Sequence, residues 1–404
     1  MPACRGRRSR VDEKLADQTL RSAGEFSFTE EQQDLRAAVR KFCADNFDEA
    51  TVRRLMESPT PFDTKVWNRL GAELGVLGLS VPEADGGVGG SLVDQAVAVE
   101  QFGTTLACGP LFGTVYLAIP ALVASPDSAA RDELLAQLVE GTRTAAFAVA
   151  DKAGAFEPSS VTVTADNNTV SGTVQRVVDG AAADEILFAA TGSDGLGLYA
   201  VDAKDTQRTP LMTLDLTRPQ ATITFVDSPA RRLAGPEEAE RVITHALQVG
   251  SALLAVEQVG AAQHLLDLSV EYAKSRLQFG RQIGSFQAIK HKLADMLVDL
   301  EHARSTAYHA VWALSDGSDD PALAVSIAQA TASAALSHIA ADTIQVHGGI
   351  GFTWEHQAHL YFKRSATDAA LLGTAEQHRS RVADFVLDDA SAEGGARVAD
   401  GLPV

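Results

Sequence analysis

Hydrophobic residues recur at helical spacing near the beginning of the chain. In the stretch "SFTEEQQDLRAAVRKFCADNF", Leu35, Val39 and Phe42 lie at positions i, i+4 and i+7, the spacing of one helix face. Gln32 follows Thr29 by three residues, which predicts a capping box at the start of this helix. Helical patterns continue in "VWNRLGAELGVLGL" and "SLVDQAVAVEQFG", and the Pro- and Gly-rich stretch "VPEADGGVGGS" between them predicts a loop.

The pattern changes near residue 145, where apolar and polar residues begin to alternate. This alternation is typical of strands, and turn signals interrupt it at residues 166–168 and 192–195. The stretch "QATITFVDSPARRL" predicts one last strand. Because the gaps between strands are too short for helical crossovers, we expect an antiparallel β segment of about 90 residues.

The rest of the chain is again helical, with long Ala- and Leu-rich stretches over 238–275, 284–314, 320–345 and 366–388. Long helices with short connections predict an antiparallel bundle, so the fold class is α+β. The domains that we expect are a flexible tail at 1–27, a helical domain at 28–143, a β-domain at 144–235, a helical-bundle domain at 236–389 and a flexible tail at 390–404.

Composition and charge exclude several classes of function. The net charge of −19 argues against nucleic acid or an anionic membrane surface as a partner, because both require basic patches. The three cysteines, Cys4, Cys43 and Cys108, lack metal or redox spacing, so we expect unpaired thiols in a reducing cytoplasm. No apolar run approaches the length of a membrane span, no apolar run follows the basic start "MPACRGRRSR", and no pattern predicts a metal site.

Four stretches carry a resemblance to a known family. "YAKSRLQFGRQIGSFQAIKHKLADM" and "QVHGGIGFTWEHQAHLYFKRS" resemble the flavin-binding stretches of the acyl-CoA dehydrogenases. "LGLSVPEADGGVGGS" and "GPLFGTVYLA" resemble the N-terminal domain of that family, and the order holds from about residue 28 to 389. The resemblance implies an N-terminal helical domain, a middle antiparallel β-domain and a C-terminal four-helix bundle. It also implies FAD, a tetramer, oxidation of an acyl-CoA thioester between Cα and Cβ, and an electron-transferring flavoprotein as electron acceptor.

The resemblance assigns cofactor and substrate roles to individual positions. Arginine is a forked donor that suits a diphosphate, and paired glycines let the backbone approach a cofactor closely. Taken alone, Arg276 would equally fit a solvated helix cation, and Gly348–Gly349 would fit a helix C-cap. The implied FAD-binding residues are Arg276, Phe279, Gln287, Gln345, Gly348, Gly349, Thr374 and Glu376. Of these, Gln345, Gly348 and Gly349 would reach the same FAD as Arg276 from a neighbouring subunit. The implied substrate-binding residues are Ser251 and Gly373.

The catalytic base of the family is missing from both of its usual positions. The base is usually the glutamate of a Tyr-Glu-Gly-Thr run, and here Leu372 stands in its place. The alternative position on an earlier helix is Gly250, with Ser251 where an arginine would follow, and Glu257 lies about two turns further on. Loss of a positioned base lowers the rate of proton transfer by about 10²- to 10⁴-fold. Gly250 and Ser251 either leave room for a bulky acyl group or reflect tight helix packing.

Two further stretches depart from the family. The loop that lies over the flavin is shortened to "ADKAGAF" at 150–156, and the strand behind the flavin reads Val177-Val178-Asp179. We expect Asp179 to place a negative charge where a reduced flavin accumulates charge, which would hinder reduction.

These departures leave three hypotheses open. In the first, the chain is the glutamate-lacking partner in a mixed dehydrogenase of the steroid side-chain type, a heterotetramer with FAD at the mixed interface. In the second, it is self-sufficient with a relocated base, for which the candidates are Glu376, Asp368, His245 and Glu257. In the third, it is a homo-oligomer with a binding or scaffold role and no redox chemistry. A flavin-dependent oxygenase on the same fold remains a minor alternative.

Overall fold

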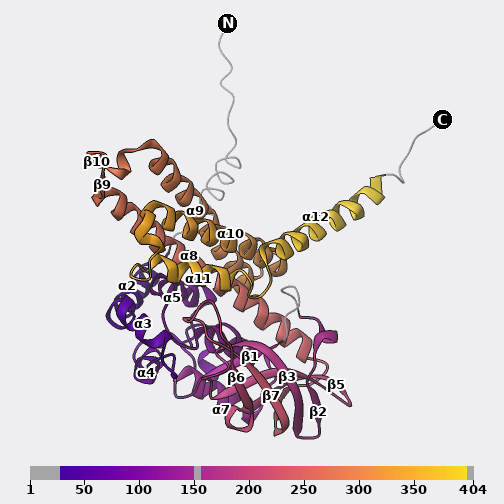
Figure 1. The fold of residues 1–404 in the computed structure, drawn as a ribbon. Helices are drawn as coiled ribbons and strands as arrows, with labels where there is room; N and C mark the ends of the chain where they lie inside the picture. The colour runs from indigo at the N-terminus through magenta and orange to yellow at the C-terminus, as the bar shows by residue number, and fades with distance from the viewer. Residues whose placement is uncertain (1–27, 150–155, 398–404) are drawn as a thin grey trace, which may run out of the picture.

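The computed structural model describes residues 28–149 and 156–397 (Figure 1). The predicted tail at 1–27 and most of the shortened loop at 150–156 lie outside the described residues. The first part of the flexible tail predicted at 390–404 is helical instead, because the last helix, α12, continues to Arg397, and residues 398–404 lie outside the described residues.

Short helices form the first part of the chain and pack around α5. The predicted capping box is confirmed: the Thr29 hydroxyl accepts the Gln32 N–H at 3.2 Å, and the Gln32 side chain accepts the Thr29 N–H at 3.1 Å. The helix predicted over "VWNRLGAELGVLGL" ends early, at Ala72, before Gly75 turns the chain with a φ of 63°. The elements are α2 (Glu30–Asn46), α3 (Glu49–Met56), α4 (Thr64–Ala72), η1 (Glu83–Asp85), α5 (Leu92–Thr105), the π-helix η2 (Leu111–Ala118), α6 (Ile119–Ala124) and α7 (Ala129–Val139).

The middle of the chain forms a mixed sheet in the order β6-β7-β3-β2-β4-β5-β8, with β1 beside β4. Both predicted hairpin turns are confirmed: one joins β2 to β3 and the other joins β4 to β5. The sheet contains short 3₁₀ turns η3 (Pro158–Ser160) and η4 (Ala203–Asp205) between its strands. The strands are β1 (Ala145–Ala148), β2 (Thr164–Asp166), β3 (Thr169–Val178), β4 (Glu185–Gly192), β5 (Gly195–Asp202), β6 (Gln207–Pro210), β7 (Gln220–Pro229) and β8 (Arg231–Ala234).

Two predictions for the sheet need correction. Most pairs are antiparallel, but β1 and β2 both pair with β4 in parallel, because the chain between them is long enough to return to the same edge. The single last strand predicted over 220–233 is two strands. β7 pairs with β3 and β6, whereas β8 pairs with β5, so the chain changes neighbours after Pro229.

A helical bundle forms the last part of the chain, as predicted. Gln258 and Ser269 on α8 hydrogen-bond to Ser333 and Thr343 on α10, so α8 and α10 run in the same direction, with α9 returning between them. In Figure 1 the β9–β10 hairpin at the tip of α8 and α9 lies at the opposite end of the bundle from the sheet. The elements are α8 (Ala239–Ser275), β9 (Leu277–Gln278), β10 (Arg281–Gln282), η5 (Ile283–Ser285), α9 (Gln287–Asp316), α10 (Pro321–His347), η6 (Gly348–Phe352), α11 (Ala358–Asp368) and α12 (Ala375–Arg397).

The helix predicted over 366–388 is wrong in its first part. α11 ends at Asp368 and α12 begins only at Ala375. Between them, Leu372 and Gly373 have positive φ angles of 55° and 104°, which a continuous right-handed helix cannot contain. The break therefore falls at the position where the catalytic base was expected.

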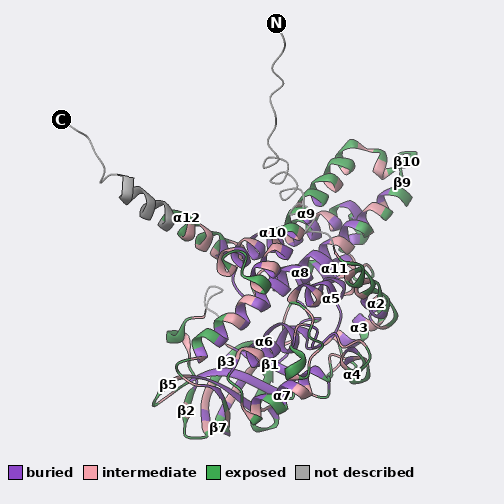
Figure 2. Cartoon of the chain, turned by 180° about the vertical axis from the view of Figure 1, so that it is seen from behind, coloured by how far each residue is buried: buried purple, intermediate pink, exposed green. Residues whose placement is uncertain are grey.

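Two core helices, α8 and α10 with its extension to Phe352, are long and apolar enough to span a membrane, contrary to the expectation from the sequence. The apolar windows of Ala239–Ser275 and Pro321–Phe352 are 83% and 61% buried within the protein, so they form the centre of the bundle (Figure 2). Close packing explains their small residues: a Cβ on Gly260 would lie 1.9 Å from the Glu100 carbonyl oxygen of α5.

Cys43 and Cys108 are free, buried thiols, and burial raises the pKa of each to about 12.

Candidate functional site

A large open cleft lies between the sheet and the α11–α12 turn. It encloses about 780 Å³. One wall is apolar and comes mainly from η2, β1, α8 and the turn; its residues include Phe112, Leu117, Phe147, Leu247, Leu371 and Leu372. The other wall comes mainly from β3 and the loop after β6. It carries most of the polar residues of the cleft, Thr162, Thr173, Gln175, Arg176, Thr213 and Gln220, together with the apolar Val174, Val178 and Leu214.

Leu372 is part of the cleft wall and is held there by its backbone. Its side chain is 8% exposed, and its carbonyl oxygen accepts a hydrogen bond from His378 Nε2 at 2.9 Å. A carbonyl only accepts, so this bond requires the proton on Nε2. Burial lowers the pKa of His378 to about 4, which keeps the ring neutral at physiological pH. The turn therefore presents position 372 to the cleft, but the side chain there cannot carry a proton.

The described lining of the cleft contains no group that could act as a base. Among the described residues that line it, Arg176 is the only ionisable side chain, and no carboxylate or histidine is present. Within residues 28–149 and 156–397 no group of three or more His, Cys, Asp and Glu residues could hold a metal ion either. The cleft can bind an amphipathic molecule, but its described walls supply no acceptor for an α-proton.

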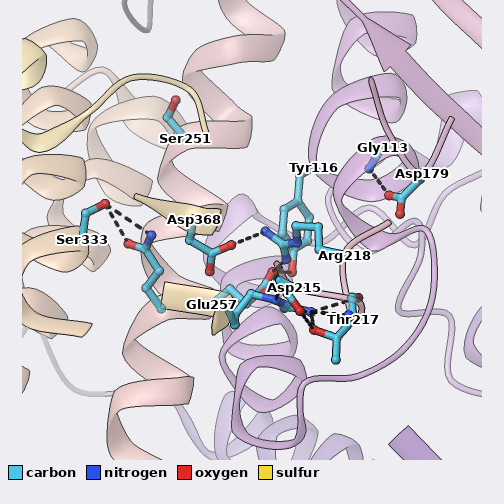
Figure 3. A network of polar contacts seen from close by, with 12 residues as sticks. Gly113, Tyr116, Asp179, Asp215, Thr217, Arg218, Ser251, Glu257, Ser333 and Asp368 are labelled. Carbon is cyan, nitrogen blue, oxygen red and sulfur yellow. Dashed lines mark hydrogen bonds and ion pairs between the residues drawn. The ribbon is translucent and has the colours of Figure 1, made fainter. Parts of the chain in front are cut away.

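Behind the cleft lies a buried network of charged residues (Figure 3). Glu257 of α8 accepts hydrogen bonds from Arg218 Nη2 at 2.6 and 2.7 Å, from Arg364 Nη1 at 2.6 Å and from the Tyr116 hydroxyl at 2.8 Å. Burial alone would raise the pKa of Glu257, but the two guanidinium groups outweigh it and hold that pKa below its usual value. Both carboxylate oxygens are therefore engaged, and the group is an ionised structural anchor.

Two more carboxylates complete this network. Asp215 accepts from Arg364 Nε at 2.9 Å, and Asp368 Oδ1 accepts from Arg218 Nη1 at 2.8 Å. With Glu257 there are three carboxylates for two arginines, so one carboxylate is in excess. Burial raises the pKa of Asp368 to about 7, and its Oδ2 has no hydrogen-bond partner among the described residues. Asp368 is therefore the member of the network that holds a proton near neutral pH.

Asp179 does not have the position that the sequence suggested. Its φ angle is 63°, and its Oδ2 accepts the Gly113 N–H of η2 at 3.0 Å. Burial raises the pKa of Asp179 to about 6. The side chain contributes to a separate cavity of about 10 Å³ next to Arg218, while Val178 lines the large cleft. The expected negative charge is therefore not part of the described lining of the cleft, because the side chain turns toward η2, and its effect on a flavin stays a prediction.

The implied cofactor residues of the bundle lie together, far from the cleft. Arg276, Phe279 and Gln287 are exposed around the β9–β10 hairpin, and the Phe279 side chain is 90% exposed. The second implied set, Gln345, Gly348 and Gly349, is also exposed at the end of α10. Because α8 and α10 run in the same direction, both sets are at one end of the bundle.

The remaining implied residues have local roles. Thr374 caps α12, since its hydroxyl accepts the Gln377 N–H at 3.3 Å, and Glu376 points to solvent with its side chain 81% exposed. Gly373 belongs to the turn after Leu372, and Ser251 lines a separate pocket of about 190 Å³.

Gly250 reflects tight helix packing. A Cβ at this position would lie 2.4 Å from Leu117 Cδ2, so the glycine lets η2 approach α8 and leaves no free space for an acyl group.

The sequence motifs assigned no role to the arginines of the buried network or to Arg176 in the cleft. Arg218 and Arg364 lie in a loop and a helix with no distinctive spacing, and they meet Glu257 only through the fold. The bulge in β3 at Gln175–Arg176 places Arg176 at the cleft, and the alternating strand pattern of the sequence did not predict this bulge.

Comparison with known proteins agrees with these features. Residues 29–142 match the N-terminal domain of the acyl-CoA dehydrogenases, and residues 240–387 match the C-terminal domain. The chain is 35% identical over 360 residues to the acyl-CoA dehydrogenase IpdE2 of Mycolicibacterium smegmatis, covering 88% of this chain and 98% of that protein. It is 36% identical over 364 residues to IpdE2 of Mycobacterium tuberculosis, covering 89% and 98%.

Two solved structures are similar over nearly the whole chain. A variant of the Tcur3481–Tcur3483 steroid ACAD has a TM-score of 0.80 at 30% identity, covering 90% of this chain and 99% of that one. The ChsE4–ChsE5 complex of Mycobacterium tuberculosis has a TM-score of 0.80 at 27% identity, covering 90% and 98%. Proteins of this family are FAD-binding flavoproteins. From both domain matches and from its identity to these relatives, the chain belongs to the acyl-CoA dehydrogenase family.

Proposed function

We propose that this chain is the non-catalytic subunit of a mixed acyl-CoA dehydrogenase whose other chain carries the catalytic glutamate. The observation that carries the proposal is Leu372, which occupies the base position in a cleft whose described lining has no carboxylate or histidine. When bound, FAD supplies the acceptor for the hydride that leaves the β-carbon. This chain contributes binding surface to that FAD rather than a group that removes the α-proton.

The geometry of the bundle supports a shared cofactor. Leu247 lines the cleft near the start of α8, and Arg276 follows the last residue of the same helix. At 1.5 Å per residue, these two positions are about 43 Å apart along a straight helix. An extended FAD molecule is shorter than that, so one FAD cannot touch both. Arg276, Phe279 and Gln287 would therefore serve an FAD whose flavin ring lies in a different chain.

The residues at this end of the bundle fit such a role. Gly348 ends α10 with a φ of 62°, a backbone conformation that favours glycine by itself. Gly349 has no such φ, and a Cβ built on it would meet no atom within 4 Å, so this exposed glycine suits a backbone that a cofactor or another subunit approaches closely. Phe279, Phe352 and Trp354 are 90%, 84% and 71% exposed, and large exposed aromatic side chains are typical of a surface covered by another chain.

The relatives suggest the substrate class and the assembly. One similar structure is described as a steroid ACAD, and the two similar structures are named for pairs of chains. We infer a heterotetramer in the cytoplasm that carries out α,β-dehydrogenation of an acyl-CoA of the steroid-degradation type. An electron-transferring flavoprotein would then reoxidise the FAD.

The test is the native mass and flavin content of the tagged chain, purified from its own host. A mixed tetramer with one FAD for every two chains is the expected result, and the second chain should have glutamate at the position matching Leu372. A homotetramer with one FAD per chain would overturn the proposal. Colourless homotetramers that bind acyl-CoA would favour the scaffold role instead.

A relocated base is the second candidate function, and one observation favours it. Asp368 is buried, its pKa is raised to about 7, and its neighbours Thr367 and Ala370 line the cleft. The other candidates are placed less well: Glu257 is fully engaged, Glu376 faces solvent, and neither they nor His245 line the cleft. A homotetramer whose activity is abolished by Asp368→Asn would support this reading.

A further inference from the structure

We propose that Arg176 recognises a negatively charged group on an amphipathic molecule bound in this chain's own cleft. The inference goes beyond the proposed function, because it concerns ligand binding and needs neither a catalytic base nor the partner chain. It also names a binding residue to which neither the sequence motifs nor the buried network had assigned a role.

The position of Arg176 is unusual for its residue type. The register between β3 and β7 shifts between Val174 and Val177, so Gln175 and Arg176 form a bulge that points both side chains to the rim of the cleft. Bulges redirect side chains in this way. Arg176 has a φ of 58°, in the left-handed region that is unfavourable for L-residues other than glycine. A strained backbone at a cleft is an observation from which a functional hypothesis can start.

The only charged side chain in the described lining of the cleft is positive. Arg176 is the only ionisable side chain among its described lining residues, and it makes no hydrogen bond or ion pair with residues 28–149 or 156–397. The net charge of the chain is −19, so this arginine gives the cleft a positive charge on a protein that is otherwise strongly negative. A guanidinium without a partner is suited to pair with a carboxylate or a phosphate of a ligand.

The rest of the cleft defines the body of that ligand. The lining from η2, α8 and the α11–α12 turn is apolar, with side chains such as Phe112, Leu117 and Leu372, while the hydroxyl and amide groups of β3 lie next to the arginine in sequence. The cleft therefore suits a molecule with an apolar body and one anionic end. The anion has two possible sources, a free carboxylate at the far end of an acyl group or a phosphate of coenzyme A.

The experiment compares three probes by titration calorimetry: decanoyl-CoA, the mono-CoA thioester of decanedioic acid, and coenzyme A alone. The protein is the complex as purified from its host, with this chain either wild type or R176Q. Loss of one partly exposed ion pair corresponds to about a fivefold weaker Kd. If the anion is the acyl carboxylate, R176Q should raise the Kd of the dicarboxylic thioester by this factor and change the Kd of decanoyl-CoA by less than twofold. Equal weakening for all three probes would assign the anion to coenzyme A.

Two control variants keep the outcome interpretable. Arg54→Gln removes an exposed arginine of α3 that does not line the cleft, and it should leave all three Kd values unchanged. Arg176→Lys keeps the charge and should recover most of the lost affinity, which a merely structural effect of the bulge would not produce. Unchanged binding of all three probes to R176Q would overturn the inference, as would an equal loss in the Arg54→Gln complex.

Discussion

Replacing Glu257 by glutamine should strongly destabilise the protein. The substitution keeps the size of the side chain but removes the negative charge between two arginines that are both buried and both within 2.7 Å of it. Removing one partner of a buried ion pair costs about 3 to 5 kcal/mol, because the opposite charge remains buried without compensation. Here two guanidinium groups lose the same partner, so the expected loss in free energy of unfolding lies at the upper end of that range.

Urea denaturation followed by circular dichroism would measure this loss as a shift of the unfolding midpoint. The matched control is Glu376→Gln, which removes the charge of an exposed glutamate whose nearest cation is 3.8 Å away. That control should change the free energy of unfolding by less than about 0.5 kcal/mol. If E257Q were no less stable than the control, the network would not anchor the fold. If it also abolished dehydrogenation while remaining stable, Glu257 would be the relocated base.

Three further predictions follow from the same structure. In Asp368→Asn, the free energy of unfolding should depend less on pH than in the wild type. The pKa of Asp368 is raised to about 7 in the folded protein from 3.8, so the folded state binds more protons than the unfolded chain between these pH values. The free energy of unfolding of the wild type therefore falls as pH rises from about 4 to 7, by up to about 1.4 kcal/mol per pH unit. Thermal unfolding of both proteins from pH 4 to 8 measures the difference. If the proposed mixed complex reacts at the partner's flavin, Leu372→Glu should leave the kcat of that complex unchanged, measured with its natural acceptor. Phe279→Ala should lower the flavin content of the complex, measured by absorbance, without lowering the unfolding temperature of this chain, since the ring is 90% exposed.

Each of these outcomes has a clear opposite. A constant stability difference between wild type and Asp368→Asn from pH 4 to 8 would show that Asp368 does not titrate in the native protein. A rise in kcat and in flavin content with Leu372→Glu would make this cleft a latent active site. For Phe279→Ala the control is Met212→Ala, which removes another fully exposed apolar side chain, and equal flavin loss in both would contradict a specific contact.

Local features were predictable because neighbouring residues determine them. The capping box of Thr29 and Gln32 and the turn between Thr164–Asp166 and Thr169–Val178 depend only on residues close in sequence, and both are present. The break after Asp368 was missed for a different reason. Its left-handed residue is Leu372, which favours helix locally, and the turn is held instead by the hydrogen bond from His378.

The buried network could not be predicted because it joins residues that are distant in sequence. Arg218 and Glu257 are 39 residues apart, and Glu257 and Arg364 are 107 apart. Each residue type by itself is more typical of a solvated surface than of a core. The motifs indicated which positions would meet a cofactor, but only the course of α8 places those positions at the far end of the bundle from the cleft.

The network and the cleft share their walls, and this explains why the cleft is well formed without a base. Arg364 and Asp368 are four residues apart on one face of α11 and bind the loop at 215–218. Thr367 of the same helix and Ala370, just after its end, line the cleft. The same loop extends to Thr213 on the polar wall. Charged contacts on the buried side therefore fix the separation of two walls of the cleft. A structure that holds an open cleft in this way, and yet presents a leucine at the reacting position, is suited to binding a ligand rather than to removing its proton.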